Sequence, residues 1–219
     1  MSANVASELL RPGLLEGVSI LHAGADGTPA SAGDSGGALV CAACAELGAG
    51  VWTLEEACAG PLGAEEATTD EAVQRILAES GGIDLLVLDA GALFAAGAIP
   101  GGQDPAARTA LRSCLEQAWN VTRAVANLAL LPSGRGGRIV YLAPAGDGGE
   151  HADAARAGLE NLARTLSVEW ARHAITAVTI APGAATTAGE LAALTAYLAS
   201  PAGAYFSGCL LDLTGAVGV

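Results

Sequence analysis

Short apolar runs alternate with longer amphipathic segments along most of the 219-residue chain. The runs are rich in Val, Ile and Leu, and their apolar residues are continuous, which is typical of strands buried on both faces. The longer segments repeat apolar residues at a helical spacing. The predicted strands are residues 17–23, 51–54, 83–88, 138–142, 175–180 and 208–213, and the predicted helices are residues 37–47, 70–80, 105–131, 152–172 and 187–199.

Local signals set several of these boundaries. Gly48 follows the first predicted helix and is expected to end it. Thr69 or Asp70 is the predicted N-cap of the second helix. Pro132 is expected to stop the long third helix, because proline cannot continue a helix interior.

The segments between these elements are rich in Gly and Ala. A loop is expected at residues 24–36, and a turn at residues 89–91 is expected to lead into a further loop that reaches Asp104. Residues 56–69 show no clear strand, although a brief one near 57–59 is one option.

Strands that alternate with helices predict an α/β fold with a doubly wound, mostly parallel sheet. Right-handed crossovers place helices on both faces, which gives a three-layer α/β/α sandwich. No linker or composition shift divides the chain, so residues 1–219 are expected to form one domain.

Composition restricts the possible partners. Hydrophobic residues make up 52% of the chain and charged residues only 15%, so we expect surplus apolar surface to be buried against another subunit. The net charge of -13 argues against nucleic acid as a partner. No apolar run is long enough to span a membrane and no secretory signal is evident, so a cytoplasmic location is expected.

Cysteine spacing gives little evidence for a metal site. Cys41 and Cys44 have CxxC spacing, but they lie in an Ala-rich helical pattern with no further ligands nearby. We interpret the five cysteines as small core residues in a reducing compartment, with a redox or metal pair as the alternative.

Several segments resemble the short-chain dehydrogenase/reductase family. The sequence IDLLVLDAG at 83–91 resembles its LVNNAG segment, and GRIVYLAPAG at 137–146 resembles its GRIVNISS strand. Residues 155–183 and 194–215 resemble the family's KAGL helix and C-terminal LxVDGG strand. The resemblance covers most of the chain and implies a Rossmann-like fold and NAD(P)-dependent oxidoreductase chemistry.

The resemblance also indicates which residues occupy the family's catalytic positions. The tyrosine and lysine of YxxxK fall at Ala152 and Arg156, the serine falls at Pro144, and the asparagine falls near Cys114. Ala and Pro side chains carry no exchangeable proton. We therefore expect a degenerate, catalytically inactive member of the family.

Neighbouring polar residues are the alternative source of acid–base chemistry. His151 and Asp153 flank the position of the missing tyrosine, but adjacent helical residues point about 100° apart. The other interpretation is that both are solvated, with Asp153 or Asp147 acting only as a helix cap.

The family's phosphate-binding loop, TGxxxGxG, is also altered. His22 and Ala23 replace its Thr-Gly, and the loop before Ser35-Gly36-Gly37 is longer than the family pattern. Its Asp26 and Asp34 would repel a pyrophosphate, and its glycines can equally be plain turn residues. We expect no cofactor in this chain.

Three vestigial cofactor-binding candidates remain, Glu55, Gly91 and Thr187. Glu55 is the acid that would hold ribose hydroxyls, or a helix-start charge. Asp89 replaces an asparagine of the turn beneath the family's cofactor. Only residues 184–189 remain of the segment that closes over the family's substrate, so the pocket is expected to lack a lid.

The family's oligomer-forming elements are retained. Two long helices, 105–131 and 152–172, carry extra apolar positions, with Trp119 and Trp170 either as interface anchors or as ordinary core. The resemblance implies a hetero-oligomer, expected to be a tetramer, with an active paralogue that holds NAD(P). Its substrates would be of the acyl-thioester or polyketide type. The alternatives are a divergent active oxidoreductase and a ligand-binding regulatory module that uses the 24–36 loop.

Overall fold

A six-stranded parallel sheet forms the centre of the computed structural model, which describes residues 6, 9–24, 36–58, 62–97 and 104–215. The strands lie in the order β2-β1-β3-β4-β5-β6, and each neighbouring pair is parallel. Their bounds are β1 Ser19–Ala23, β2 Gly50–Thr53, β3 Leu85–Asp89, β4 Gly137–Leu142, β5 Ile175–Ala181 and β6 Leu210–Asp212.

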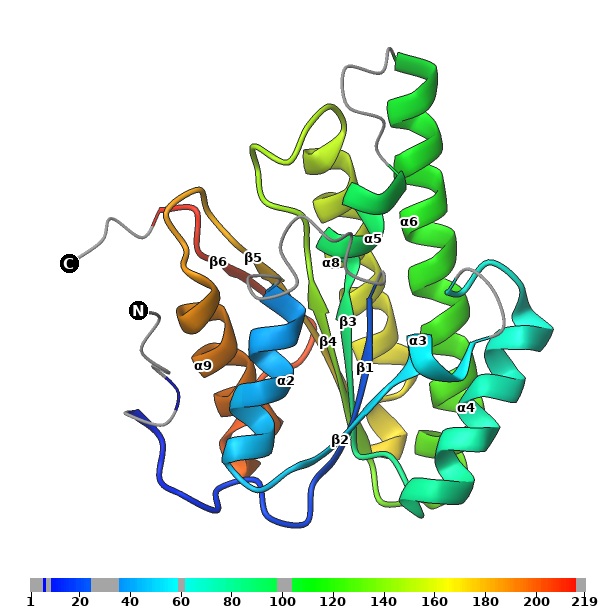
Figure 1. The fold of residues 1–219 in the computed structure, drawn as a ribbon, viewed down its shortest axis with the longest axis vertical. Helices are drawn as coiled ribbons and strands as arrows, with labels where there is room; N and C mark the ends of the chain where they lie inside the picture. The colour runs from blue at the N-terminus through cyan, green and yellow to red at the C-terminus, as the bar shows by residue number, and fades with distance from the viewer. Residues whose placement is uncertain (1–5, 7–8, 25–35, 59–61, 98–103, 216–219) are drawn as a thin grey trace.

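Helices cover both faces of this sheet (Figure 1). On one face lie α2 (Gly36–Glu46) and α9 (Ala188–Ala199), which pack against each other. On the other face lie α4 (Glu66–Ser80), α5 (Ala90–Gly97), α6 (Asp104–Val125) and α8 (Ala152–Glu169). The predicted doubly wound, Rossmann-like sandwich is thus confirmed.

The alternation of side chains along β3 explains why its sequence is continuously apolar. Leu85 and Val87 join the core beneath α2 and α9, whereas Leu86 and Leu88 join the core beneath α4, α6 and α8. All four are fully buried. A strand covered on both faces has no position left for a polar side chain until its end.

The region after β2 differs from the prediction. Leu54 is not in the strand, because it begins a short helix, α3 (Leu54–Ala57), whose first turn contains Glu55 and Glu56. Acidic side chains are favourable at a helix N-terminus. The optional strand near 57–59 is therefore wrong for residues 57 and 58, and residue 59 lies outside the described part of the chain.

Helix α4 begins earlier than predicted, with Glu65 rather than Thr69 or Asp70 at its N-cap. The Thr69 hydroxyl donates to the Glu65 carbonyl, 2.7 Å away, so it supports the first turn from inside the helix. Asp70 instead pairs with Arg123 of α6, at 2.8 Å. The carboxylate that resembled a cap therefore joins two helices.

The segment after β3 is a helix where a turn and loop were predicted. The Asp89 side chain accepts a hydrogen bond from the Ala92 N–H at 2.9 Å, which is the interaction of a helix N-cap. Helix α5 follows directly from that contact. Residues 98–103 lie outside the described part.

Pro132 does not stop the long helix. A π-helical turn at Ala126–Leu130 follows α6, and α7 (Leu131–Ser133) carries Pro132 in its first turn, where proline is tolerated. Gly134, with φ 64°, ends the helical segment in the left-handed region. No helix in the described ranges is both long and apolar enough to cross a membrane.

The C-terminal third follows the prediction closely. Helix α8 ends at Glu169, three residues earlier than expected, and a short 3-10 turn, Ala171–His173, completes the connection. Helix α9 starts one residue later than predicted, and β6 is shorter at both ends.

Candidate functional site

The candidate site lies at the carboxyl ends of the strands. Strand β1 is flanked by β2 on one side and β3 on the other, so the order in which strands are added to the parallel sheet reverses between β1 and β3. Ligands of doubly wound folds bind outside the carboxyl ends at such a point. His22 and Ala23 end β1 there, and Asp89 ends β3.

Cys114, at the family's asparagine position, points into the core. Its Sγ donates to the Ala90 carbonyl at 3.3 Å, and the residue is fully buried. Burial raises the pKa of this thiol to about 12, with the nearby Asp89 charge adding to the effect. Cys114 is therefore a neutral thiol at pH 7.

The serine and tyrosine positions hold small apolar residues. Pro144 is buried directly after β4, and Ala152, the first residue of α8, is only 1% exposed. Their side chains are packed, and they have no group that can donate or accept a proton.

Arg156, at the lysine position, is held between two loops. Its guanidinium donates to the carbonyl of Pro182, which follows β5, at 3.4 Å. It also lies 3.6 Å from the carboxylate of Asp212, the last residue of β6. Hydrogen bonds from the Thr214 side chain and backbone, together with the Arg156 charge, lower the pKa of Asp212. The cation thus ties α8 to the ends of β5 and β6.

His151 and Asp153 lie at the start of α8, beside the vacant tyrosine position. His151 is the N-cap residue, with φ 69°, and its side chain makes no cap hydrogen bond. Asp153 is exposed in the first helical turn, where its charge favours the helix N-terminus. The predicted capping role of Asp153 or Asp147 is wrong, because the cap position belongs to His151.

A second group of polar residues surrounds the start of α2. An added Cβ on Gly37 would lie 2.5 Å from His22 Nε2 and 2.7 Å from Asp89 Oδ2. An added Cβ on Gly24 would lie 3.1 Å from Asp89 Cβ and 3.2 Å from His22 Cε1. The space over both glycines is thus filled by the side chains of His22 and Asp89.

Glu55 completes this group, which we call the His22–Glu55–Asp89 cluster. Its carboxylate accepts a hydrogen bond from the Gly24 backbone N–H. His22 as a whole retains some exposure, but its Nε2 is covered and has no hydrogen-bond partner among the described residues. Burial lowers the pKa of His22, and the Asp89 charge opposes this shift only in part.

The other cofactor candidates have structural roles. Gly91 lies in α5, where an added Cβ would be 3.4 Å from the Ala143 carbonyl. Thr187 is the N-cap of α9, and it forms a capping box with Glu190. Its hydroxyl accepts from the Glu190 N–H at 3.2 Å and donates to the Glu190 carboxylate at 2.8 Å.

The cysteines near the site are protonated thiols. Burial raises the pKa of Cys41 and Cys44 to about 12 in each case, and Glu55 and Asp89 reinforce the shift at Cys41. All five cysteines are free. Among the described residues, no three His, Cys, Asp or Glu side chains are grouped so as to hold a metal ion.

The resemblance assigned His22, Glu55 and Asp89 to the family's cofactor site, but it did not predict that their side chains fill the space over Gly24 and Gly37. His22 appeared only as a departure from a glycine-loop pattern, and Asp89 only as a replaced asparagine. A usable signal was present for Asp89, because an Asp before an apolar Ala-rich run is a typical helix start. Nothing local connects residues 22, 55 and 89.

Comparison with known proteins establishes the family. The family model described as enoyl-(acyl carrier protein) reductase matches residues 63–189, which is more than half of the chain. The chain belongs to the short-chain dehydrogenase/reductase family. No curated protein matches it.

Solved structures of this family superpose closely. The citronellol catabolism dehydrogenase of Pseudomonas aeruginosa PAO1 is 28% identical, covering 95% of this chain and 98% of its own, with a TM-score of 0.74. A hydroxysteroid dehydrogenase from Escherichia coli is 17% identical over 94% and 99%, with a TM-score of 0.68. A Serratia marcescens short-chain dehydrogenase/reductase variant is 21% identical over 91% and 96%, with a TM-score of 0.70. The last two show likeness of fold alone.

Proposed function

We propose that this chain is a non-catalytic short-chain dehydrogenase/reductase subunit. It assembles with an active paralogue into a hetero-oligomeric NAD(P)-dependent dehydrogenase or ketoreductase. The observation that carries the proposal is the occupation of the catalytic positions by Cys114, Pro144, Ala152 and Arg156. Loss of general acid–base help alone costs on the order of 10²- to 10⁴-fold in rate.

The packing of these positions supports the proposal beyond residue identity. Ala152 and Pro144 are buried, so a water molecule or a neighbouring side chain does not simply take the place of the lost hydroxyl groups. The Cys114 thiol has one proton, and it donates that proton in a hydrogen bond to the Ala90 carbonyl. Arg156 remains cationic but is engaged by Pro182 and Asp212.

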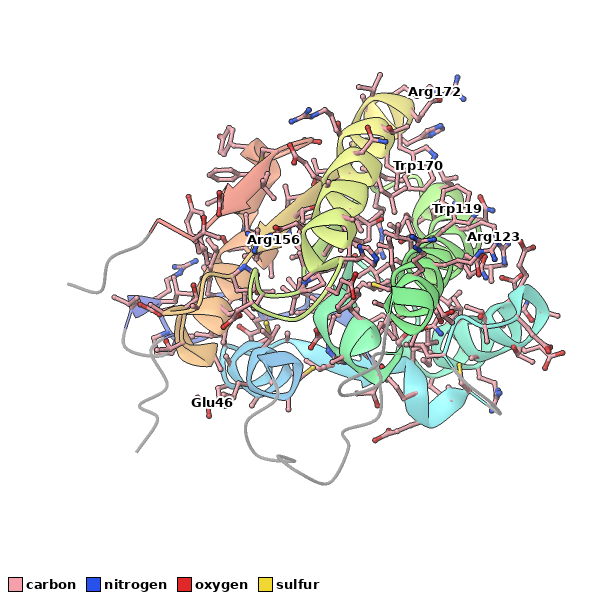
Figure 2. All side chains as sticks on the ribbon, turned by 90° about the horizontal axis from the view of Figure 1, so that it is seen from above. Glu46, Trp119, Arg123, Arg156, Trp170 and Arg172 are labelled. Carbon is pink, nitrogen blue, oxygen red and sulfur yellow. The ribbon has the colours of Figure 1, made fainter. Side chains whose placement is uncertain are left out.

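The outer surface of α6 and α8 is the proposed contact with the paralogue. Trp119 is 42% exposed and Val168 is 73% exposed, whereas Leu115 and Trp170 are half-buried against the core. Figure 2 places the labelled Trp119 and Trp170 beside α6 and α8, on the side away from α2 and α9. Exposed aromatic and aliphatic side chains of this kind are typical of interface anchors.

The partner's chemistry follows from the family. The match to the enoyl-(acyl carrier protein) reductase model supports an acyl-thioester or polyketide-type substrate for the complex. The partner supplies NAD(P) and the proton donor, and this chain supplies a folded neighbour. We place the assembly, a tetramer, in the cytoplasm, which suits five free cysteines.

The decisive experiment is co-expression with the reductase encoded beside this chain, followed by mass measurement of the complex. A stable hetero-oligomer is expected, and a Trp119→Ser/Val168→Ser variant should bind about 30-fold more weakly, as for loss of one interface hot spot. Leu9→Ser is the matched control, because Leu9 is exposed but lies outside α6 and α8.

Two results would overturn the proposal together. One is a stable, monodisperse assembly of this chain alone. The other is an unchanged activity and solubility of the neighbouring reductase in its presence.

A divergent active oxidoreductase is the second candidate. It is favoured by the cation that Arg156 retains at the lysine position, and by the 28% identity to a dehydrogenase. Turnover of NAD(P)H with a panel of ketones by the purified chain would establish it. The third function, a regulatory module, depends on residues 25–35, which lie outside the described part of the chain.

A further inference from the structure

The His22–Glu55–Asp89 cluster lies where a dinucleotide-binding fold places its pyrophosphate. Glycines in that loop normally let the backbone approach the phosphates closely, with the helix N-terminus pointing at them. Here the atoms that approach Gly37 most closely are His22 Nε2 and Asp89 Oδ2, at 2.5 and 2.7 Å from its Cβ position. The glycine space is used by the chain's own side chains.

Two backbone N–H groups beside the cluster donate to its carboxylates. The Gly24 N–H, at the end of β1, donates to the Glu55 carboxylate. The Ala92 N–H, at the start of α5, donates to Asp89 Oδ1 at 2.9 Å. The Gly24 N–H is therefore already paired, and the Asp89 carboxylate is held in place by α5.

The charge of the cluster has the wrong sign for an anion. Glu55 and Asp89 are carboxylates, and burial lowers the pKa of His22, so the imidazole adds no compensating positive charge at pH 7. Burial raises the pKa of Cys41 on α2, and the charges of Glu55 and Asp89 add to that shift. A pyrophosphate brought here would be repelled.

We propose that His22, Glu55 and Asp89 form an internal plug that stands in for the pyrophosphate of NAD(P). Asp89 places its carboxylate at the N-terminus of α2, Glu55 holds Gly24, and His22 fills the space between them. The inference rests on the proposed function in one respect, since it explains how this subunit folds with an empty cofactor site. It adds that the side chains of His22, Glu55 and Asp89 are what prevents NAD(P) from binding, so substitution of these residues should restore binding.

The test is calorimetric titration of NADH and NADPH into the purified full chain and three variants. His22→Thr/Asp89→Asn restores the residue types of the family pattern at both positions. Asp89→Asn alone keeps the cap of α5, because Asn caps helices as well as Asp does, so it carries the test even where the double variant is unstable. Asp84→Asn is the control, because it removes one carboxylate from the opposite end of the same sheet.

The expected result is no saturable binding to the wild-type chain or to Asp84→Asn. The double variant should bind saturably, with a Kd at least about tenfold below the highest nucleotide concentration tested on the wild-type chain, and Asp89→Asn should show a smaller gain. Binding of NADH to the wild-type chain as tight as to the double variant would overturn the plug. Folded variants that gain no affinity over wild type would overturn it as well. Neither outcome concerns assembly with a paralogue, so the plug and the proposed function fail separately.

Discussion

The two halves of the candidate site are filled by side chains of opposite character. Around β4 and α8 the side chains are apolar, and Pro144 and Ala152 are buried at the positions that resemble the family's serine and tyrosine. Around β1, α2 and β3 the side chains are polar, and those of His22, Glu55 and Asp89 fill the space over Gly24 and Gly37. The proposed function and the proposed plug thus depend on two separate features, the first on missing hydroxyl groups and the second on side chains that occupy space.

The first half should resist restoration most strongly. Ala152→Tyr puts a phenol ring at a position that is 1% exposed, and overpacking of this kind should cost about 3 kcal/mol of unfolding free energy. Chemical denaturation measures the change. Ala154→Tyr, on the exposed side of the same helical turn, should stay within about 0.5 kcal/mol of wild type. Equal effects at the two positions would show that the tyrosine site has not closed.

In the second half, the cost of adding a side chain at Gly37 should depend on His22 and Asp89, which fill the space over it. Gly37→Ala should destabilise the chain by about 1–2 kcal/mol, because the new methyl group would meet His22 and Asp89. In a His22→Ala background the part of this cost that comes from His22 should disappear, whereas the contact with Asp89 at 2.7 Å remains, and a double-mutant cycle measures the coupling.

Gly158→Ala is the matched substitution in the first half. Its Cβ would lie 2.9 Å from Leu115 Cδ2, the far end of a flexible side chain that can shift. Because alanine also has the better helix propensity, by about 1 kcal/mol, the change should be near neutral or stabilising. A cost as large as that of Gly37→Ala would remove the distinction between the halves.

The cluster should also make stability depend on pH. The folded-state pKa of His22 is lowered, so below its ordinary value of 6.5 the unfolded chain binds more protons than the folded chain. The unfolding free energy should therefore fall as the pH drops from 7.5 toward 5.5. The facing charges are Asp89 from β3 and Glu55 from α3, with the Cys41 thiol on α2.

Urea melts across that pH range, compared between wild type and His22→Gln, measure this contribution. The variant should lose part of the slope, whereas His173→Gln, beside Arg172 on the surface, should retain it. An unchanged slope in His22→Gln would place the pH dependence elsewhere in the molecule.

The smallest expected effect concerns Thr187, which could have been a cofactor contact. Thr187→Ala removes the capping box of α9 and should cost roughly 1 kcal/mol. That loss lowers Tm by about 2–4 °C in a chain of this size. Thr165→Ala, at an exposed position of α8, should leave Tm almost unchanged.

The sequence by itself determined the layered fold, because each element carries its own signal. Val140 and Leu86 belong to runs that are apolar on both sides, and such runs are buried in a parallel sheet wherever they pair. The resemblance of residues 155–183 then aligned Ala152 and Arg156 with known positions. The sequence therefore showed, without the structure, that residue 152 carries no phenol group.

Tertiary structure alone decided what fills the cofactor half and what the caps do. The sequence predicted Asp70 as an N-cap, yet Asp70 pairs with Arg123 of α6, which is 53 positions away in the chain. His22, Glu55 and Asp89 end three different strands or their following turns, and only the parallel pairing of those strands brings them together. The spacing of residues along the chain determines local structure. Which residues lie beside the end of a strand depends on the order of the strands in the sheet, and that order is not determined by any single segment of the sequence.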